Sequence, residues 1–492
     1  MQAGAYQGMK NIGSSVTLKL MTFNVWVGGD QVSFSKVIEA ITASGADIVC
    51  LQEPQGATAE IATAAGFPYA SIDHHVISRF PLYAPPTERQ PSGLRLNYLY
   101  AELAPGEFVA VFNWHLPSGP EYVSYALRDG QSVEQVLRSA KTSRLPSIEP
   151  YLPIIKNTAD AGTPVVVAGD FNGPSHLDWT EATIDSRPYQ RAAVDWPVTK
   201  RLSDMGFVDT YRAIHPDPKA RRGATWTLGY PYPHRDAREV EDRIDYVQAL
   251  GPVRVLDAEL MGDPGMPDND IAVSPWPSDH RAVVATLEAE GGPAPAMISV
   301  ARPVLRRGES IDLRYHAATE DGRLEDGRVV VLPMGAAADA AAILSMNTNI
   351  GSDRMRGVDL GSSALQPGAY VAALRDVSGE ELARAPFWIL AADARPELST
   401  DNARYRSGEP IRVRWSNAPG HAFDMIALYA QGESNPINYR VQLFTDAASS
   451  GSLVFDEAVT GAKLAPGSYD LRLMLDDGYE ELGRVSFTVM AP

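Results

Sequence analysis

The sequence predicts an α/β domain followed by two all-β sandwich modules, and three observations lead to this prediction. From about residue 16 to residue 290, short apolar runs alternate with helix-like patterns, as they do in α/β proteins. The segment EGGPAPA at 290–296 is rich in Pro and Gly, and short alternating strands separated by turns follow it. This second part of the chain also repeats itself once, which predicts two modules of one kind.

The α/β region begins with a strand–helix–strand unit. VTLKLMTFNV at 16–25 predicts the first strand because apolar and β-branched residues run through it. A helix is predicted over 33–45, with a serine as its N-terminal cap and a glycine where it ends. DIVCLQE at 47–53 predicts the next strand. Further strands are predicted over 107–116, 164–172, 243–250 and 280–289.

The repeat in the second part of the chain has a constant spacing. RGESIDLRY reappears as SGEPIRVRW, LQPGAYVAAL as LAPGSYDLRL, and EELARAPFWI as EELGRVSFTV, each 99 or 100 residues later. A unit of that length made of short strands is typical of a β-sandwich. We therefore expect one sandwich over 297–391 and a second over 396–492, after an α/β domain over 16–290.

Composition excludes several classes of protein. The net charge of −18 repels polyphosphate chains, which disfavours a nonspecific nucleic-acid binder. No run of eighteen apolar residues is present, so no transmembrane segment is predicted. The single cysteine, Cys50, lies in the apolar run DIVCL and is expected to be an inert core residue.

The location and partners of the protein are less constrained. The N-terminal residues MQAGAYQGMKNIGSS lack the layout of a secretion signal, so the protein is either cytoplasmic or has lost its signal. Tandem sandwiches usually place an enzyme on a surface, a polymer or a protein partner, which favours a secreted, extracellular or periplasmic protein.

The sequence also predicts the contacts of the linker and the solvent exposure of the acidic turns in the modules. The Pro/Gly linker predicts few contacts between the α/β domain and the modules, so residues 1–290 are expected to fold alone. The acidic turns LEDG and LDDGYEE are expected to be ordinary solvated turns, and His316 and His421 to be isolated.

Polar side chains stand where the predicted strands of the α/β domain end. In VVVAGDFNGPS, Asp170 and Asn172 follow a buried strand two residues apart, so an extended chain points both the same way. Each such residue alone is explained by a turn or a cap. Together they form the set that phosphoryl chemistry uses: oxygen ligands for a hard cation, donors to a phosphate, and an imidazole beside a carboxylate. The other members are Asn24, Glu53, His115, Asp245, Asp279 and His280.

The motifs around these residues occur in a recognisable order. TFNVW, LQEP, NWHLPS, GDFNGP, DRIDYV and PSDHRAV resemble the endonuclease/exonuclease/phosphatase superfamily over residues 17–288. The resemblance implies a DNase I-like, four-layer α/β sandwich as the catalytic domain. It also implies hydrolysis of a phosphate ester by in-line attack of an activated water.

The resemblance implies a divalent metal ion. Glu53 would be the principal Mg²⁺ ligand, with Asn24 and Asp279 supporting it, and Mn²⁺ or Ca²⁺ would be substitutes. Mg²⁺ keeps several waters and needs few carboxylate oxygens, so one Glu with weaker helpers makes an adequate site.

The resemblance also implies roles in catalysis. Asp170 would orient or deprotonate the attacking water, and Asn172 would hold the phosphate or that water. His115 would donate to the phosphate oxygens. His280 would act beside the phosphate, with Asp245 fixing its tautomer and raising its basicity.

The phosphate ester itself is less defined. We expect a small or lipid-derived phosphodiester, with a nuclease acting on DNA or RNA and a phosphomonoesterase as alternatives. WHLPSGPEY lacks the lysine-bearing motif of the inositol polyphosphate 5-phosphatases, which disfavours their substrates. A surface-binding protein built on an inactive hydrolase scaffold is the non-enzymatic alternative. Candidates for the substrate pocket are Tyr122, Trp226, Tyr230, Tyr232, His234 and Arg235, although aromatic residues in such loops also pack structurally.

Overall fold

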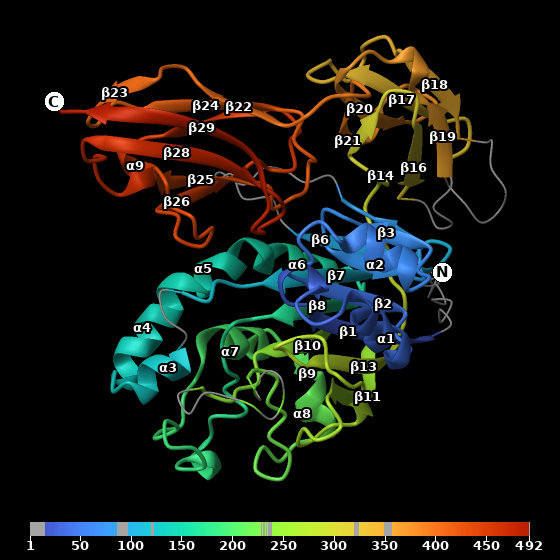
Figure 1. Ribbon diagram of the computed structural model, residues 1–492. Helices are drawn as coiled ribbons and strands as arrows, with labels where there is room; N and C mark the ends of the chain where they lie inside the picture. Colours follow the sequence, from blue (N-terminus) through green and yellow to red (C-terminus); the bar gives the residue numbers. More distant parts are fainter. Residues whose placement is uncertain are drawn as a thin grey trace, which may run out of the picture.

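The chain folds into three parts, which Figure 1 shows as an α/β domain and two β-sandwiches. This computed structural model describes residues 15–85, 97–119, 123–227, 229, 232, 234, 239–318, 324–348 and 357–491. The α/β domain holds the strands and helices up to residue 289, and the sandwiches hold those from residue 297 onward. The predicted fold class, an α/β sandwich followed by two all-β sandwiches, is confirmed.

The first sheet of the α/β domain has the strand order β12-β11-β13-β1-β2-β4-β3. At its centre β1 (Val16–Asn24) pairs in parallel with β2 (Ile48–Gln52) and antiparallel with β13 (Ala282–Ala289). These are three of the predicted strands. The others are β3 (Tyr69–Ser71), β4 (Val76–Ser78), β11 (Val253–Gly262) and β12 (Ile271–Ala272).

The second sheet has the order β5-β6-β7-β8-β10-β9. Here β7 (Glu107–His115) runs parallel to β8 (Val165–Asp170), and β10 (Asp245–Leu250) runs antiparallel to β8. These three strands were also predicted. The sheet is completed by β5 (Leu82–Tyr83), β6 (Tyr98–Ala104) and β9 (Val208–Asp209).

The two sheets pack face to face, and helices cover their outer faces. Leu20 and Val283 of the first sheet share a buried cluster with Val111 and Val166 of the second. On the far side of the first sheet lie α1 (Phe34–Ser44) and α2 (Thr58–Ala64). On the far side of the second lie α5 (Leu145–Ile148), α6 (Leu152–Asp160) and α7 (Pro197–Asp204). The remaining helices of the domain are α3 (Val123–Arg128), α4 (Val133–Ser143) and α8 (Thr210–Ile214).

The two sandwiches have the same topology, strand for strand. The first pairs sheets β14-β16-β19 and β15-β21-β20-β17-β18, and the second pairs β22-β24-β27 and β23-β29-β28-β25-β26. The first contains β14 (Met297–Val300), β15 (Val304–Arg306), β16 (Ser310–His316), β17 (Arg328–Pro333), β18 (Leu344–Asn347), β19 (Gly357–Gly361), β20 (Gly368–Arg375) and β21 (Glu381–Leu390). The second contains β22 (Glu397–Thr400), β23 (Arg404–Arg406), β24 (Ile411–Ser416), β25 (Met425–Ala430), β26 (Val441–Phe444), β27 (Gly451–Phe455), α9 (Glu457–Thr460), β28 (Gly467–Met474) and β29 (Glu481–Met490).

The linker between the α/β domain and the first sandwich is bound to the domain. Gly292 exchanges two backbone hydrogen bonds with Phe108, of 2.8 and 3.0 Å. His316 is buried, with its ring centroid 4.5 Å from that of Phe108. The expectations of few contacts across the linker and of an isolated His316 are therefore wrong, because a Pro/Gly composition describes the linker's own backbone and not the surface on which it lies.

The second sandwich also contacts the α/β domain. Its β28–β29 connection, red in Figure 1, reaches the domain next to the residues that follow β2. Asp476 in this connection is 1% exposed and bonded across the junction, and His421 lies 3.7 Å from it. The expectations that LDDGYEE is an ordinary solvated turn and that His421 is isolated are wrong. The other acidic turn does expose Glu325 and Asp326 to solvent.

Two simpler expectations concern single features of the chain. Cys50 is fully buried, and burial raises the pKa of its thiol far above its ordinary value, which fits an inert core residue. Among the described residues, no helix is both long enough and apolar enough to cross a membrane.

Candidate functional site

The predicted polar residues meet because of strand direction and register. Asn24 ends β1, Glu53 directly follows β2, and parallel β1 and β2 therefore present both residues at one edge of the first sheet. In the second sheet, His115 at the end of β7 pairs with Asp170 at the end of β8. Asp170 in turn pairs with Asp245, the first residue of antiparallel β10. Packing the sheets face to face brings the two edges together.

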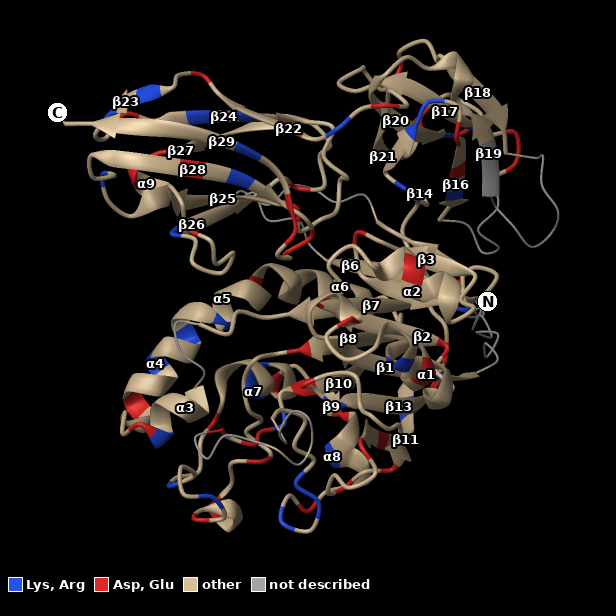
Figure 2. Cartoon of the chain, in the orientation of Figure 1, with Lys and Arg blue, Asp and Glu red and all other residues tan. Residues whose placement is uncertain are grey.

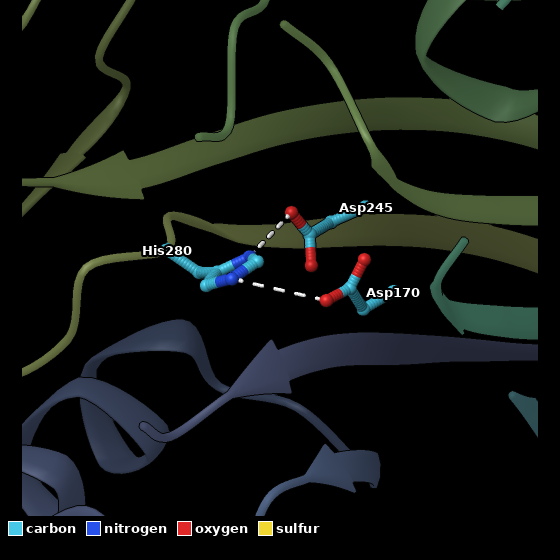
Figure 3. Close-up of side chains that lie close together, drawn as sticks. All are labelled: Asp170, Asp245 and His280. Carbon is cyan, nitrogen blue, oxygen red and sulfur yellow. Dashed lines mark hydrogen bonds and ion pairs between the residues drawn. The ribbon is translucent and has the colours of Figure 1, made fainter. Parts of the chain in front are cut away.

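Asp170, Asp245 and His280 form the centre of the site (Figure 3). The His280 Nδ1 atom lies 3.1 Å from Oδ2 of Asp245, and its Nε2 atom lies 3.8 Å from Oδ2 of Asp170. All three side chains are buried. Burial alone would lower the pKa of His280, but the carboxylates of Asp245, Asp170 and Asp279 outweigh it and raise that pKa well above its ordinary value.

The pKa of Asp170 lies above the ordinary value of an aspartate. Burial raises it to about 6, with repulsion from Asp245 adding to the rise and His280 and His115 opposing it. A carboxylate with a pKa near neutrality is suited to accepting a proton. Because His280 Nδ1 is already bonded to Asp245, the arrangement favours proton handling over metal binding at this cluster.

His280 is fixed from its backbone side as well. The Trp276 Nε1–H donates to the His280 carbonyl at 2.6 Å, and the His280 N–H donates to Oγ of Ser278 at 3.1 Å. Ser278 Oγ–H in turn donates to the Asn24 carbonyl at 2.7 Å, which ties the segment before β13 to the end of the neighbouring strand β1. The supporting role of Trp276 was not predicted, since an aromatic residue before the motif SDH has no local signal that separates packing from substrate contact.

Glu53 sits in a second group of polar atoms. Its Oε1 accepts from Nδ2 of Asn24 at 2.9 Å, and its Oε2 accepts from the Val27 N–H at 3.1 Å. Burial pushes the pKa of Glu53 upward, but His115, Asn24, His280 and Val27 together leave it lowered. Glu53 also has a φ of +56°, a left-handed conformation that costs free energy unless the surroundings hold it.

The residues around Glu53 fit a divalent cation. Asp279 interacts with Glu53, and burial together with that repulsion raises the pKa of Asp279. Its Oδ2 accepts from Nε1 of Trp226 at 3.2 Å, while its buried Oδ1 has no hydrogen-bond partner among the described residues. Two mutually repelling carboxylates, one with an unsatisfied oxygen, are the ligands that a hard cation needs. Asn24 contributes as a bridge, since its Nδ2 also lies 3.3 Å from Asp170 while its Oδ1 accepts from the Trp26 N–H at 3.0 Å.

His115 and Asn172 complete the set of residues at the strand ends. The His115 Nε2 atom lies 3.6 Å from Asp170 and 3.9 Å from Glu53, and the ring is 30% exposed, so it faces the opening of the site. The Asn172 backbone N–H donates to Asp170 Oδ1 at 2.8 Å, and its Nδ2 donates to the Leu116 carbonyl at 2.9 Å. Asn172 therefore fixes Asp170 as well as lying beside it.

The six candidates for the substrate pocket lie in different surroundings. Trp226 lies at the site, with its ring centroid 6.0 Å from that of His280 and its Nε1–H bonded to Asp279. Tyr232 instead packs against the domain and donates its hydroxyl to the Gly265 carbonyl at 2.6 Å. His234 is exposed. The remaining candidates, Tyr122, Tyr230 and Arg235, lie outside the described residues.

Two further residues near the site come from the second sandwich. Asp477 interacts electrostatically with His115 and Glu53, and Tyr479 with Glu53 and Asp279. Both residues are exposed. Sequence reasoning missed them because they lie more than 400 residues from Glu53, in a segment that has the composition of a surface turn.

A separate cavity lies where all three parts of the chain meet. Its volume is about 700 Å³, and its lining includes Asp73, Ile298, Trp388 and Ala448. None of the residues at the strand ends lines it, so the acidic cluster rather than this cavity marks the candidate site.

Comparisons with known proteins find a similar sequence and several similar solved structures. The uncharacterized protein F14F9.5 from Caenorhabditis elegans is 30% identical over 297 residues, which span 54% of this chain and 90% of that protein. An endonuclease/exonuclease/phosphatase from Beutenbergia cavernae is similar in structure at 20% identity and a TM-score of 0.35, covering 76% of this chain and 99% of its own. The protein TDP2 from Caenorhabditis elegans is similar at 16% identity and a TM-score of 0.35, covering 56% of this chain and 75% of its own.

The sequence also matches a family model. The match runs over residues 21–280 and so contains every polar residue described at the strand ends. The model is that of the endonuclease/exonuclease/phosphatase family. The chain therefore belongs to the endonuclease/exonuclease/phosphatase family.

Proposed function

We propose that the protein is a divalent-metal-dependent hydrolase of phosphate esters, with a small or lipid-derived phosphodiester as its substrate. One observation carries the proposal: a buried imidazole lies between two buried carboxylates, beside a separate pair of acidic residues that fits a cation. Phosphoryl transfer needs both parts, one to manage protons and one to offset charge on the phosphate.

The roles of the residues follow from their positions. A bound Mg²⁺ would polarise the phosphate, and Glu53 and Asp279 would hold it. Asp170, with its pKa raised to about 6, orients the attacking water and accepts its proton. Asp245 keeps His280 charged and oriented as a donor to the phosphate.

Two further side chains act at the phosphate. His115 is partly exposed at the opening, so it can donate to a second phosphate oxygen. Asn172 holds Asp170 in place through its backbone N–H, and its Nδ2 lies 3.3 Å from Oδ2 of Asp170, the oxygen nearest to His115 and His280. Together with His280 they supply donors on several sides of one phosphate group, which is how a charged transition state is stabilised.

The charge around the site supports a substrate with little negative charge. Glu53, a proposed metal ligand, is repelled by the carboxylates of Asp279 and Asp477, and the whole chain carries a net charge of −18. A phosphodiester brings one negative charge, whereas a nucleic acid brings one per phosphate and is repelled at long range.

A substrate panel tests the proposed reaction. The full chain would be stripped with EDTA and assayed on bis-p-nitrophenyl phosphate, p-nitrophenyl phosphate, sphingomyelin, plasmid DNA and single-stranded DNA, with added Mg²⁺, Mn²⁺ or Ca²⁺. We expect hydrolysis of the diesters that requires added metal and disappears with EDTA. Faster hydrolysis of DNA would replace the proposal with a nuclease, and no hydrolysis under any condition would indicate an inactive scaffold.

The proposed metal ligand has its own test. Glu53→Gln keeps the side-chain shape and removes the charge that a hard cation needs, so the Mg²⁺ concentration for half-maximal activity should rise at least about 10-fold. Glu60→Gln, at an exposed position on α2, is the matched control and should leave it unchanged. Unaltered activity of Glu53→Gln at low micromolar Mg²⁺ would contradict the assignment.

A further inference from the structure

The connection between β28 and β29 of the second sandwich, residues 475–480, is fastened to the α/β domain by a buried carboxylate. We call this connection the acidic turn; its ribbon is partly red in Figure 2. Oδ1 of Asp476 accepts a hydrogen bond from Nε2 of His75 at 2.8 Å, and Oδ2 accepts one from the Gly56 N–H at 2.7 Å. Both bonds cross between parts of the chain about 400 residues apart.

The acidic turn is equally well held by its own sandwich. The Asp476 N–H donates to Oδ1 of Asp424 at 3.1 Å, and the Asp477 N–H donates to the Phe423 carbonyl at 2.8 Å. The ring of Phe423 lies 5.2 Å from that of His75 across the junction. A carboxylate this buried is retained only where it is paired. His75 and the Gly56 N–H supply the pairing, and against the upward effect of burial they keep the pKa of Asp476 lowered.

The segment that the acidic turn holds is the one that carries Glu53. Gly56 lies three residues after Glu53, and a Cβ added to it would stand 3.0 Å from the side chain of Leu475 in the turn. A Cβ added to Gly478 would stand 3.0 Å from Gln55. Glu53 and Gln55 both have left-handed φ values, of +56° and +45°. Such a conformation persists where the surroundings over-determine it, and the acidic turn is part of those surroundings.

The acidic turn also presents side chains to the site. Asp477 and Tyr479 are exposed, yet both interact with Glu53, and Tyr479 interacts with Asp279 as well. Asp477 lies between Asp476, which accepts from the Gly56 N–H, and Gly478, which faces Gln55, so it belongs to the junction that follows Glu53. Desolvation by the neighbouring protein raises the pKa of Asp477 to about 6 although His115 opposes the rise, so its carboxyl carries a negative charge above that pH. A second negative charge on a substrate would be repelled there, whereas a neutral or cationic alcohol group would not.

Resting on the proposed function, we propose that the second sandwich completes the active site. Asp476 is a positioning residue that holds the Glu53 segment, and Asp477 selects phosphodiesters whose alcohol groups carry no further negative charge. The sandwich is then a wall of the active site as well as a possible attachment module, so the α/β domain alone would be an incomplete enzyme.

The positioning role of Asp476 is tested on the full chain with Asp476→Asn. We expect faster hydrogen exchange in the peptide that contains Gly56, and Mn²⁺ affinity, measured by calorimetry, lower by about 10- to 100-fold. Asp376→Asn, in the corresponding turn of the first sandwich, is the matched control and should change neither. His75→Leu removes the donor of the same hydrogen bond from the other side and serves as the test variant if Asp476→Asn does not fold. Unchanged exchange at Gly56 and unchanged Mn²⁺ affinity in a folded variant would overturn the proposal.

The selective role of Asp477 is tested with two diesters that share a leaving group. p-Nitrophenyl phosphorylcholine has a cationic alcohol group, and methyl p-nitrophenyl phosphate has a neutral one. The ratio of kcat/KM for the first to that for the second should fall about 2- to 5-fold in Asp477→Asn, as expected for an exposed charge, and further in Asp477→Lys. An unchanged ratio in both variants would overturn the selective role.

The two proposals fail in different ways. If the wild-type chain hydrolysed neither diester, the proposed function would fail, while the exchange and Mn²⁺ measurements would still decide whether Asp476 holds the Glu53 segment. If the wild-type chain hydrolysed both diesters and the Asp476 and Asp477 variants behaved like it, only this inference would fail.

Discussion

The two β-sandwiches share one topology but meet the α/β domain in different ways. In the first, the Asp376 N–H donates to the Glu380 carbonyl and closes a connection of three residues, 377–379. In the second, the Leu475 N–H donates to the Glu480 carbonyl and closes one of four residues, 476–479. The first connection exposes Val377 by 75%, while the second buries Asp476 against His75.

The contacts of the first sandwich lie elsewhere. Ser299 accepts from the Ala84 N–H at 2.7 Å, and the guanidinium of Arg314 lies 4.6 Å from the ring centroid of Tyr69. None of these residues belongs to the strand ends that form the site. The comparison teaches that a repeated module takes its role from one connection: the first sandwich only attaches, and the second reaches the Glu53 segment. Under the proposed function, the α/β domain supplies the chemistry, while the second sandwich positions the Glu53 segment and selects the substrate.

The largest expected effect tests that division of labour. Asp245→Asn or His280→Ala should each lower kcat/KM by roughly 10²- to 10⁴-fold, because both remove the same oriented imidazolium. The double variant should lose little more than His280→Ala alone, since Asp245 acts through the ring. Asp204→Asn, an exposed carboxylate of α7, is the control. Multiplicative losses would show that Asp245 acts independently, for instance as a metal ligand.

A smaller effect comes from exchanging the two connections. Replacing residues 476–479 with the sequence Val-Ser-Gly of 377–379 removes Asp476 and Asp477 while keeping the sandwich topology. Activity should fall by about 10- to 100-fold, in line with the loss of groups that support a metal ligand. The reverse exchange in the first sandwich should leave activity unchanged. The kinetics of both chimeras check this. A loss of activity only in the chimera with the altered first sandwich would reverse the roles assigned to the two sandwiches.

The candidate site could be predicted because its signals are local. Asp170 ends the apolar run of β8, and strand direction places it at the edge of the sheet. Asn172 lies beyond the strand with a φ of +49°, so it reaches Asp170 through this turn and not through the extended chain that the sequence predicted. Strand β6 gave a weaker signal, because it contains Glu102, whose buried carboxylate is paired with Tyr83 at 2.9 Å and breaks the apolar pattern.

The role of the acidic turn could not be predicted in this way. His75 and Asp476 are 401 residues apart, and only the docking of a separate sandwich brings them together. The residues LDDGYEE correctly predict a turn, but they do not indicate which surface the turn contacts. The same holds for the linker at Gly292, whose hydrogen bonds to Phe108 depend on the start of β7, a strand more than 180 residues earlier in the chain.

The smallest expected effect is a difference in pH dependence between two junctions, those of the first and of the second sandwich with the α/β domain. His316, between the first sandwich and the α/β domain, is buried against Phe108, and burial lowers its pKa to about 4 although its bond to the Ala294 carbonyl opposes this. A histidine with a lowered pKa in the folded state stabilises the protein above its unfolded pKa, and that stabilisation is lost as the pH falls from about 6.5 toward 4. Asp476 at the second junction has a lowered pKa, so its contribution persists until the pH falls below about 4.

Acidification from pH 7 to pH 5 should therefore weaken the first junction, while Asp476 at the second junction stays ionised. Thermal unfolding of the full chain provides the measurement, with His316→Gln as the variant that removes the titrating group and keeps a side chain able to donate to Ala294. The wild type should lose a few degrees of Tm more than His316→Gln over this interval, while Asp476→Asn should lose as much as the wild type. An equal loss of Tm in wild type and His316→Gln would show that the first junction does not depend on a neutral imidazole, and the contrast between the two junctions would then rest on the acidic turn alone.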